Sequence, residues 1–251
     1  AGGSARIPIG AEGKKMLLYK VLQRRKEELK LFGASGNQLG FIGHLNDLYS
    51  EFKRYELDPG LLEEGLSNWN TSSSAPILGD KLHDLLLIYR DYEQELTELY
   101  IDDEDTLTEL NERLAESELL QDAQIWIDGF LGFTPQEMSV IGRMMLQSSS
   151  VTITLTLDRP YDHGALPSEL DLFHPTASAY ARLKGMAEDL GVMSETMVLQ
   201  PDILPRYDHS PGLAHLESGF DRRIRWRSDG RDAGVKLYAA ENRRAEMEGA
   251  L

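Results

Sequence analysis

The sequence contains no cysteine among its 251 residues, so this chain forms no disulfide and offers no thiolate ligand to zinc or to an iron–sulfur cluster. It also lacks a long hydrophobic run, because stretches such as Leu85–Ile88 are far too short to span a bilayer. The six histidines are scattered, with no pair at the spacing of metal ligands on a helix. These absences predict a protein of a reduced, cytoplasmic compartment with no membrane segment and no metal site of its own.

Basic residues are scarce. The chain has 42 acidic and 26 basic side chains, a formal net charge of −16, which argues against a nucleic-acid-binding module that acts by itself. The segment 91–122 carries thirteen Asp or Glu residues and one base, Arg113. Such a charge run is typical of a solvated helical face. The alternative is a surface that contacts a basic partner or repels DNA.

The first half of the chain has the periodicity of helices. Apolar residues recur at steps of three and four, which places them on single helical stripes. The predicted helices are 13–32, with Leu17, Leu18, Val21, Leu22 and Leu29 buried; a stripe of Phe41, Leu45, Leu48, Phe52 and Tyr55; a short helix from the Asp58–Pro59 start signal to Leu66; a stripe of Leu78, Leu82, Leu85, Tyr89, Tyr92, Leu96 and Leu99; and 103–120. The small polar stretch 68–76 is predicted to be a mobile connection.

After about residue 120 the pattern changes to strands that alternate with helices. Strands are predicted at 123–127, 151–157, 196–199 and 235–240, and helices at 135–147, 176–190 and from 240 onward. This alternation indicates a parallel sheet in an α/β layer. The predicted fold class is therefore α/β, with an all-helical subdomain at 1–120 followed by an α/β subdomain at 121–251.

Asp128 stands at the carboxyl end of the first predicted strand, where open α/β sheets bind ligands. A hydrophobic strand that ends in aspartate also begins the second nucleotide-binding motif of P-loop ATPases, in which the aspartate helps to hold Mg²⁺. In helicases a glutamate follows, whereas here the next residue is Gly129. The phosphate-binding motif Gly-x-x-x-x-Gly-Lys-Ser/Thr is absent from the chain. Asp128 and Gly129 are therefore interpreted as the remnant of a nucleotide site that cannot hold a triphosphate by itself.

Aromatic residues surround this aspartate. Trp126 lies in the middle of the strand and is predicted to be core. Phe130 begins the following loop, where its ring either packs under the loop or offers a stacking face to a base. Phe133 is a second candidate for contact with DNA. The sequence from Thr134 to Glu137 has the capping threonine, proline and glutamate of a helix start, which explains Glu137 without a catalytic role.

A basic island surrounds Trp226 and consists of Arg222, Arg223, Arg225, Arg227 and Arg231. Guanidinium groups interleaved with an aromatic ring can follow a nucleic-acid backbone, so Arg222, Arg223 and Arg225 are candidates for backbone contacts. Nearby aspartates and glycines favour a solvated linker instead. No catalytic dyad or nucleophile motif is recognisable.

Seven short segments of the chain are distinctive: KMLL at 15–18, EFKRY at 51–55, KLHD at 81–84, DGFLGFTPQE at 128–137, ELDLF at 169–173, LAHLE at 213–217 and AENRRAE at 240–246. In this order they resemble the AddB family, the B subunits of the bacterial AddAB ATP-dependent helicase–nucleases. The resemblance covers essentially the whole chain.

The resemblance implies a part of the N-terminal helicase-like region, with 1–120 similar to the helicase 1B subdomain and 121–251 similar to an incomplete 1A layer. It implies that AddA, the partner in the heterodimer, is the motor, and that the helicase-like domains of AddB scan single-stranded DNA for the recombination hotspot Chi. ATP with Mg²⁺ and a 4Fe–4S cluster are expected in the full-length family but not in this segment. Both ends are expected to be truncated relative to the family.

Two functions therefore remain in view. In the first, the chain is a recognition and scaffolding segment of a helicase–nuclease that processes DNA double-strand ends, with no activity alone. In the second, it belongs to an active superfamily 1 ATPase whose general base is another residue, for instance Glu137. Because Glu137 already fits as a capping residue, the sequence favours the first.

Overall fold

The structure is a computed structural model and describes residues 6–70, 76–159, 161, 168–199, 205–207, 209–220, 223–227, 235 and 238–249. The chain divides into two compact units, one formed by Ala1–Glu169 with Phe173–Ser194 and the other by Leu170–Leu172 with Glu195–Leu251. The change from helices to α/β structure near residue 120 therefore occurs inside the first unit. The division into helicase-like subdomains stays a prediction.

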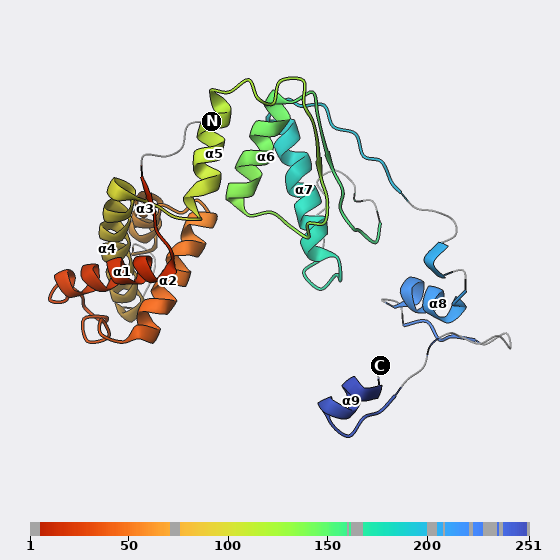
Figure 1. The fold of residues 1–251 in the computed structure, drawn as a ribbon, viewed down its shortest axis with the longest axis horizontal. Coiled ribbons are helices and arrows are strands. Elements are labelled where there is room, and N and C mark those ends of the chain that lie inside the picture. The colour runs from red at the N-terminus through yellow and green to blue at the C-terminus, as the bar shows by residue number, and fades with distance from the viewer. Residues whose placement is uncertain are drawn as a thin grey trace. The chain divides into compact units, whose positions relative to one another are not determined.

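Four helices form the first core of unit 1 (Figure 1). They are α1 (Ala11–Arg25), α2 (Leu39–Arg54), α3 (Pro59–Asn70) and α4 (Pro76–Leu99), and α1 packs on both α2 and α4. The predicted stripes supply this core, because Leu18, Val21, Leu45, Tyr89 and Leu96 are at most 3% exposed. The buried stripes are shorter than predicted, because Tyr55 and Leu99 at their ends and Leu78 at the start of the second are exposed.

The Asp58 cap is confirmed, because its Oδ1 accepts a hydrogen bond from Leu61 N at 2.9 Å. Helix α3 runs past the predicted end at Leu66 to Asn70, so the connection predicted from residue 68 begins too early. The rest of that connection, 71–75, lies outside the described residues.

Helix α1 ends at Arg25, seven residues before the predicted end at Phe32. The chain turns there because Asp84 of α4 accepts hydrogen bonds from three successive backbone N–H groups, those of Lys30 (2.9 Å), Leu31 (2.7 Å) and Phe32 (3.0 Å). Gly33 follows, and a Cβ there would lie 2.7 Å from the carbonyl oxygen of Lys26. The buried carboxylate therefore ties the turn after α1 to α4.

The segment before residue 120 was expected to contain helices only, but it also contains two short strands, so that expectation is wrong. β1 (Ile7–Pro8) and β2 (Tyr100–Ile101) pair in parallel, and Ile9 N donates to Ile101 O at 2.9 Å next to the pair. Strands of two residues are too short to show an alternating pattern, so no periodicity marks them. A fifth helix, α5 (Asp105–Ala115), follows β2 and is shorter than the predicted 103–120.

The acidic segment pairs with bases from the N-terminal helices. Asp91, Glu93, Glu95, Asp102, Glu104 and Asp105 form ion pairs with Lys14, Lys20, Arg24, Arg25, Lys53 and Arg54. Several of these groups are buried, such as Lys14, Asp91 and Asp102, each at most 7% exposed. The first half of the acidic segment is therefore neither a wholly solvated face nor a surface for a basic partner, since it holds α1, α2 and α4 together.

The α/β part of unit 1 consists of β3 (Gln124–Ile127), α6 (Pro135–Gln147), β4 (Ser150–Ile153) and α7 (His174–Asp189). The two strands pair in parallel with Ile125 opposite Val151 and Ile127 opposite Ile153, as predicted, although β4 is shorter than the predicted 151–157. Their inward side chains pack with Met138 and Ile141 of α6 and Leu183 of α7.

Among the described residues, helices cover only one face of the β3–β4 pair. Along each strand, half-buried residues alternate with exposed ones, and Trp126 on the open face is 66% exposed. The prediction that Trp126 belongs to the core is therefore wrong. A strand of alternating burial looks like a fully buried strand when its exposed positions are also apolar.

Unit 2 contains a 3-10 turn η1 (Pro205–Tyr207), α8 (Pro211–Gly219) and α9 (Arg243–Gly249). The strand predicted at 196–199 is wrong, because those residues are not in a strand. Of the strand predicted at 235–240, the described residues also lie outside any strand, and 236–237 are outside the described residues. The terminal helix predicted from residue 240 is α9. None of the described helices is long and apolar enough to cross a membrane.

Candidate nucleic-acid interface

The loop that follows β3 begins with Asp128 at the carboxyl edge of the parallel pair. Thr154 N donates to Ile127 O at 3.0 Å, and the Thr154 hydroxyl donates to Asp128 Oδ1. The aspartate is thus tied to the segment that follows β4, as expected for residues at the same end of parallel strands. Thr154 was not predicted as a site residue, although the parallel register places it one residue past β4, beside Asp128.

The backbone conformation of Gly129 disfavours the glutamate that follows this aspartate in helicases. Its φ is +84°, in the left-handed region that glycine adopts without strain, and a Cβ at this position would meet no atom within 4 Å. Space therefore does not exclude a side chain here, but the backbone conformation disfavours one. The loop turns at the residue where helicases place their catalytic glutamate.

Replacing Gly129 with alanine is expected to lower the free energy of unfolding by about 1 kcal/mol, because an L-residue is strained at this φ. Gly132 is the matched control, since it also has open space around a Cβ but is not in the left-handed region. Gly132→Ala should be neutral or slightly stabilising. Urea unfolding of both variants measures the difference, and equal effects would contradict this account of Gly129.

The two phenylalanines of the loop lie against each other. Their ring centroids are 5.3 Å apart with an interplanar angle of 29°. Phe133 is 8% exposed and belongs to the α/β core, whereas Phe130 is 45% exposed. Phe133 therefore presents little of its ring to a base, and its contact with DNA stays a prediction that its burial does not favour. Phe130 combines both predicted alternatives: it packs on Phe133 and keeps part of its ring accessible.

The far end of the loop is fixed by α6 and α7. Thr134 caps α6 in a capping box, in which Glu137 Oε2 accepts from Thr134 N at 2.7 Å. Arg182 of α7 donates from Nη1 to the carbonyl oxygen of Phe133 at 3.1 Å. The capping role predicted for Glu137 is confirmed. Arg182 was not anticipated, because nothing in the sequence near it signals a contact with residue 133.

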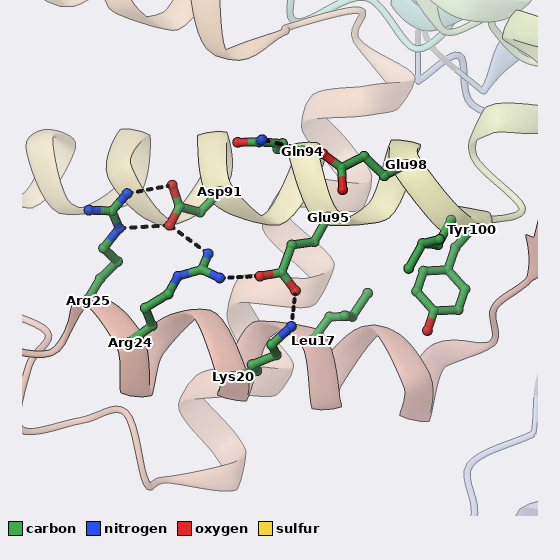
Figure 2. A pocket seen from close by; sticks show the side chains of 10 residues that line it. Leu17, Lys20, Arg24, Arg25, Asp91, Gln94, Glu95, Glu98 and Tyr100 are labelled. Carbon is green, nitrogen blue, oxygen red and sulfur yellow. Dashed lines mark hydrogen bonds and ion pairs between the residues drawn. The ribbon is translucent and has the colours of Figure 1, made fainter.

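A groove of about 430 Å³ lies between α1 and α4 and is lined by no residue of this loop. Figure 2 shows the side chains that line it. Arg25 donates two hydrogen bonds to the Asp91 carboxylate, from Nε (2.7 Å) and Nη2 (3.1 Å). Arg24 pairs with both Asp91 and Glu95. The guanidinium of Arg25, joined by that of Arg24, holds the pKa of Asp91 below its usual range despite burial. Lys20, Arg24 and Arg25 in this groove are already paired with Asp91 and Glu95, so these side chains join the two helices and do not favour a ligand site here.

The basic island of unit 2 is described only in part. Arg223 and Arg225 are exposed, and Arg222 lies outside the described residues. The Trp226 ring packs on His215 at a centroid distance of 5.1 Å, and His215 Nε2 lies 2.8 Å from Ile224 O. Arg223 and Arg225 thus precede a tryptophan that packs on His215, and their contact with a nucleic-acid backbone stays a prediction.

The residues of this chain do not fit the cofactors that the resemblance implies for the full-length family. A 4Fe–4S cluster needs cysteine ligands, and the sequence has none. Within the described residues, no group of three or more His, Asp or Glu side chains is arranged to hold a metal ion. The interpretation of Asp128 and Gly129 as the remnant of a nucleotide site stays a prediction, and no lysine-bearing glycine-rich loop accompanies them in the sequence.

An aspartate at the carboxyl edge of a parallel pair, following a helical segment, is compatible with a helicase-like α/β protein. The chain belongs to the AddB family: the family model described as ADDB, N-terminal, matches residues 1–217.

Similar proteins from three bacteria support this assignment, and each is named as the B subunit of an ATP-dependent helicase/deoxyribonuclease. The chain is 41% identical over 249 residues to the one from Desulforudis audaxviator, covering 99% of this chain and 21% of that protein. It is 41% identical over 251 residues to the one from Moorella thermoacetica, covering 100% of this chain and 22% of the relative. The chain is 39% identical over 252 residues to the one from Geobacillus kaustophilus, covering 98% of this chain and 21% of that protein. The chain thus spans about a fifth of the length of these relatives.

Proposed function

We propose that this chain is a helicase-like segment of AddB within an ATP-dependent helicase–deoxyribonuclease that processes DNA ends for recombinational repair in the cytoplasm. In this proposal it acts as a scaffold without motor activity and contacts single-stranded DNA through Phe130. The motor is the AddA subunit, and the sequence recognised on the strand is Chi. Residues 1–120 correspond to the helicase 1B subdomain and 121–251 to part of the 1A layer.

The observation that carries this proposal is the conformation of the loop after β3. At Gly129 the backbone has φ +84°, where a glutamate would be strained. Glu137, the other carboxylate considered as a general base, is engaged with both the backbone and the hydroxyl of Thr134. These contacts favour a scaffold over an active superfamily 1 motor. ATP with Mg²⁺ and the 4Fe–4S cluster would then be held by other parts of the complex.

Phe130 is the residue that best fits contact with a passing strand. Its ring is supported from one side by Phe133 and is 45% exposed, so a base can stack on the accessible part. Stacking of one base on an aromatic side chain contributes about 1–3 kcal/mol, which is roughly ten- to a hundredfold in affinity. That range is large enough to decide whether a passing sequence is held.

The test is Phe130→Ala in the full-length protein assembled with its partner. We expect the Chi-dependent product to be lost while unwinding and degradation continue, because the motor and nuclease centres lie elsewhere. Leu131→Ala is the matched control, since Leu131 is 72% exposed in the same loop but has no aromatic ring. The 251-residue chain by itself, with its net charge of −16, should bind DNA weakly or not at all. A wild-type yield of the Chi-dependent product from the Phe130 variant would contradict the proposal.

A further inference from the structure

Arg182 is a guanidinium fixed beside the Phe130 loop. It is exposed on α7, and its Nη1 donates to the carbonyl oxygen of Phe133, whose ring supports that of Phe130. Among the described residues it forms no ion pair with a carboxylate. Arginine has five N–H donors, so a single bond to a carbonyl leaves most of them available.

This lack of a carboxylate partner contrasts with the basic residues of the N-terminal helices. Lys14, Arg24, Arg25 and Lys53 each pair with at least one acidic side chain. The guanidinium of Arg182, which no carboxylate of the described residues pairs with, is therefore a local positive charge that can attract an anion in a chain of net charge −16. Asp128, the acidic residue of the loop, accepts a hydrogen bond from the Thr154 hydroxyl.

We propose that Arg182 binds a phosphate of the same single strand whose base stacks on Phe130. An accessible aromatic face combined with a fixed cation is the composition of single-strand-binding surfaces. The bond to Phe133 O restricts the guanidinium and reduces the side-chain entropy that phosphate binding would otherwise cost. This inference rests on the proposed function, because it needs a strand to pass over Phe130.

The experiment measures the affinity of the full-length two-subunit complex for a single-stranded oligonucleotide over a range of salt concentrations. Each phosphate contact contributes about 0.7 to the slope of log K against log salt for single strands. Arg182→Gln should reduce the slope by about 0.7. When the salt concentration rises from about 50 to about 200 mM, the fold loss of affinity of this variant should therefore be roughly 2.6 times smaller than that of the wild type. Arg182→Lys, which keeps the charge, should restore the slope.

Lys184→Gln is the control for the charge change. Lys184 lies on the same helix, but its Nζ donates to Ser194 Oγ at 2.9 Å, so its removal should leave the slope unchanged. Phe130→Ala should weaken binding without changing the slope, because stacking releases no counterion.

The outcomes separate the two proposals. If Arg182→Gln weakens binding but leaves the slope at the wild-type value, Arg182 only holds the loop in position, and the phosphate contact is refuted. An unchanged affinity and slope refute it as well. If instead Arg182→Gln reduces the slope while Phe130→Ala has no effect on affinity, the phosphate contact stands and base stacking on Phe130 fails.

Discussion

Replacing Asp84 with alanine is expected to lower the free energy of unfolding by about 3–5 kcal/mol, the range seen when a buried hydrogen-bond network is broken. Asp84 is fully buried, and its two carboxylate oxygens accept the N–H groups of Lys30, Leu31 and Phe32. Without the carboxylate, three backbone donors at the turn after α1 lose their acceptor. Since α1 contributes Leu18, Val21 and Leu22 to the core, we expect the loosened turn to weaken the whole helical cluster.

The measurement is urea unfolding of the 251-residue chain, followed by circular dichroism. Asp80→Ala is the matched control, because Asp80 lies one turn earlier on α4 and forms only an exposed ion pair with Lys30. That change should cost about 0.5 kcal/mol or less. Similar losses for the two variants would show that Asp84 does not anchor the turn.

The same contacts give Asp84 a pH dependence. Burial raises its pKa, but the three backbone N–H groups outweigh burial and hold the pKa below the ordinary value. A carboxylate with a depressed pKa in the folded state stabilises the protein fully above its unfolded pKa of about 3.9. We therefore expect this contribution to persist through neutral pH and to be lost as the pH falls through the folded pKa, whereas Asp84→Ala should lack that acid-side loss.

Replacing Lys53 with methionine is expected to cost about 3–5 kcal/mol near pH 8, because removing one partner of a buried ion cluster leaves the remaining charges uncompensated. The Lys53 side chain is 9% exposed, and its Nζ lies 2.7 Å from Asp105 Oδ1, 3.2 Å from Asp102 Oδ2 and 3.6 Å from Glu93 Oε1. Methionine is an unbranched side chain one heavy atom shorter than lysine, and it carries no charge. Glu93, Asp102 and Asp105 would then lose the cation that they share, although Lys14 Nζ still lies 3.7 Å from Asp102 Oδ2 and Arg6 Nη1 lies 3.9 Å from Asp105 Oδ2.

The loss should shrink as the pH falls toward 5. Burial raises the pKa of Glu93 to about 7, although the charge of Lys53 opposes that rise. Since the folded state binds this proton more tightly than the unfolded state, Glu93 makes the chain less stable as the pH rises from about 4.5 to about 7. Without Lys53 this penalty grows at high pH, while protonated Glu93 needs no partner at low pH.

Unfolding curves of Lys53→Met at several pH values between 5 and 8 test this account. Lys20→Met is the control, because Lys20 is 65% exposed where it pairs with Glu95. It should cost less than about 1 kcal/mol at any of these pH values. A loss for Lys53→Met that does not depend on pH would show that burial, and not the carboxylate cluster, sets its effect.

The sequence predicts best where a local pattern is complete. The bounds of α6 were predicted residue for residue, because Thr134, Pro135 and Glu137 together specify a helix start. The parallel pairing of β3 and β4 followed from the helix between them. The stripes of α1 and α4 identified most of the first core, because their apolar period is sustained over several turns.

The rest depended on contacts between residues distant in the chain. Nothing local indicates that Asp84 ends α1, or that the acids after Asp91 find their partners in α1 and α2. Trp126 was misplaced because apolarity does not reveal which face of a sheet is covered. In the candidate site, Asp128 and Phe130 are predicted from their position after a strand, and their roles stay predictions, whereas the burial of Phe133 and the contact made by Arg182 required the structure.

The proposed contact of Phe130 with single-stranded DNA in the full-length complex can be tested by photocrosslinking. For this, p-benzoylphenylalanine replaces Phe130 and, as the control, Leu119, which is 77% exposed in the turn after α5. Upon irradiation of the translocating complex, we predict covalent attachment of the single strand to position 130 and not to position 119. Absence of a DNA adduct at position 130, or an equal yield at both positions, would contradict the claim.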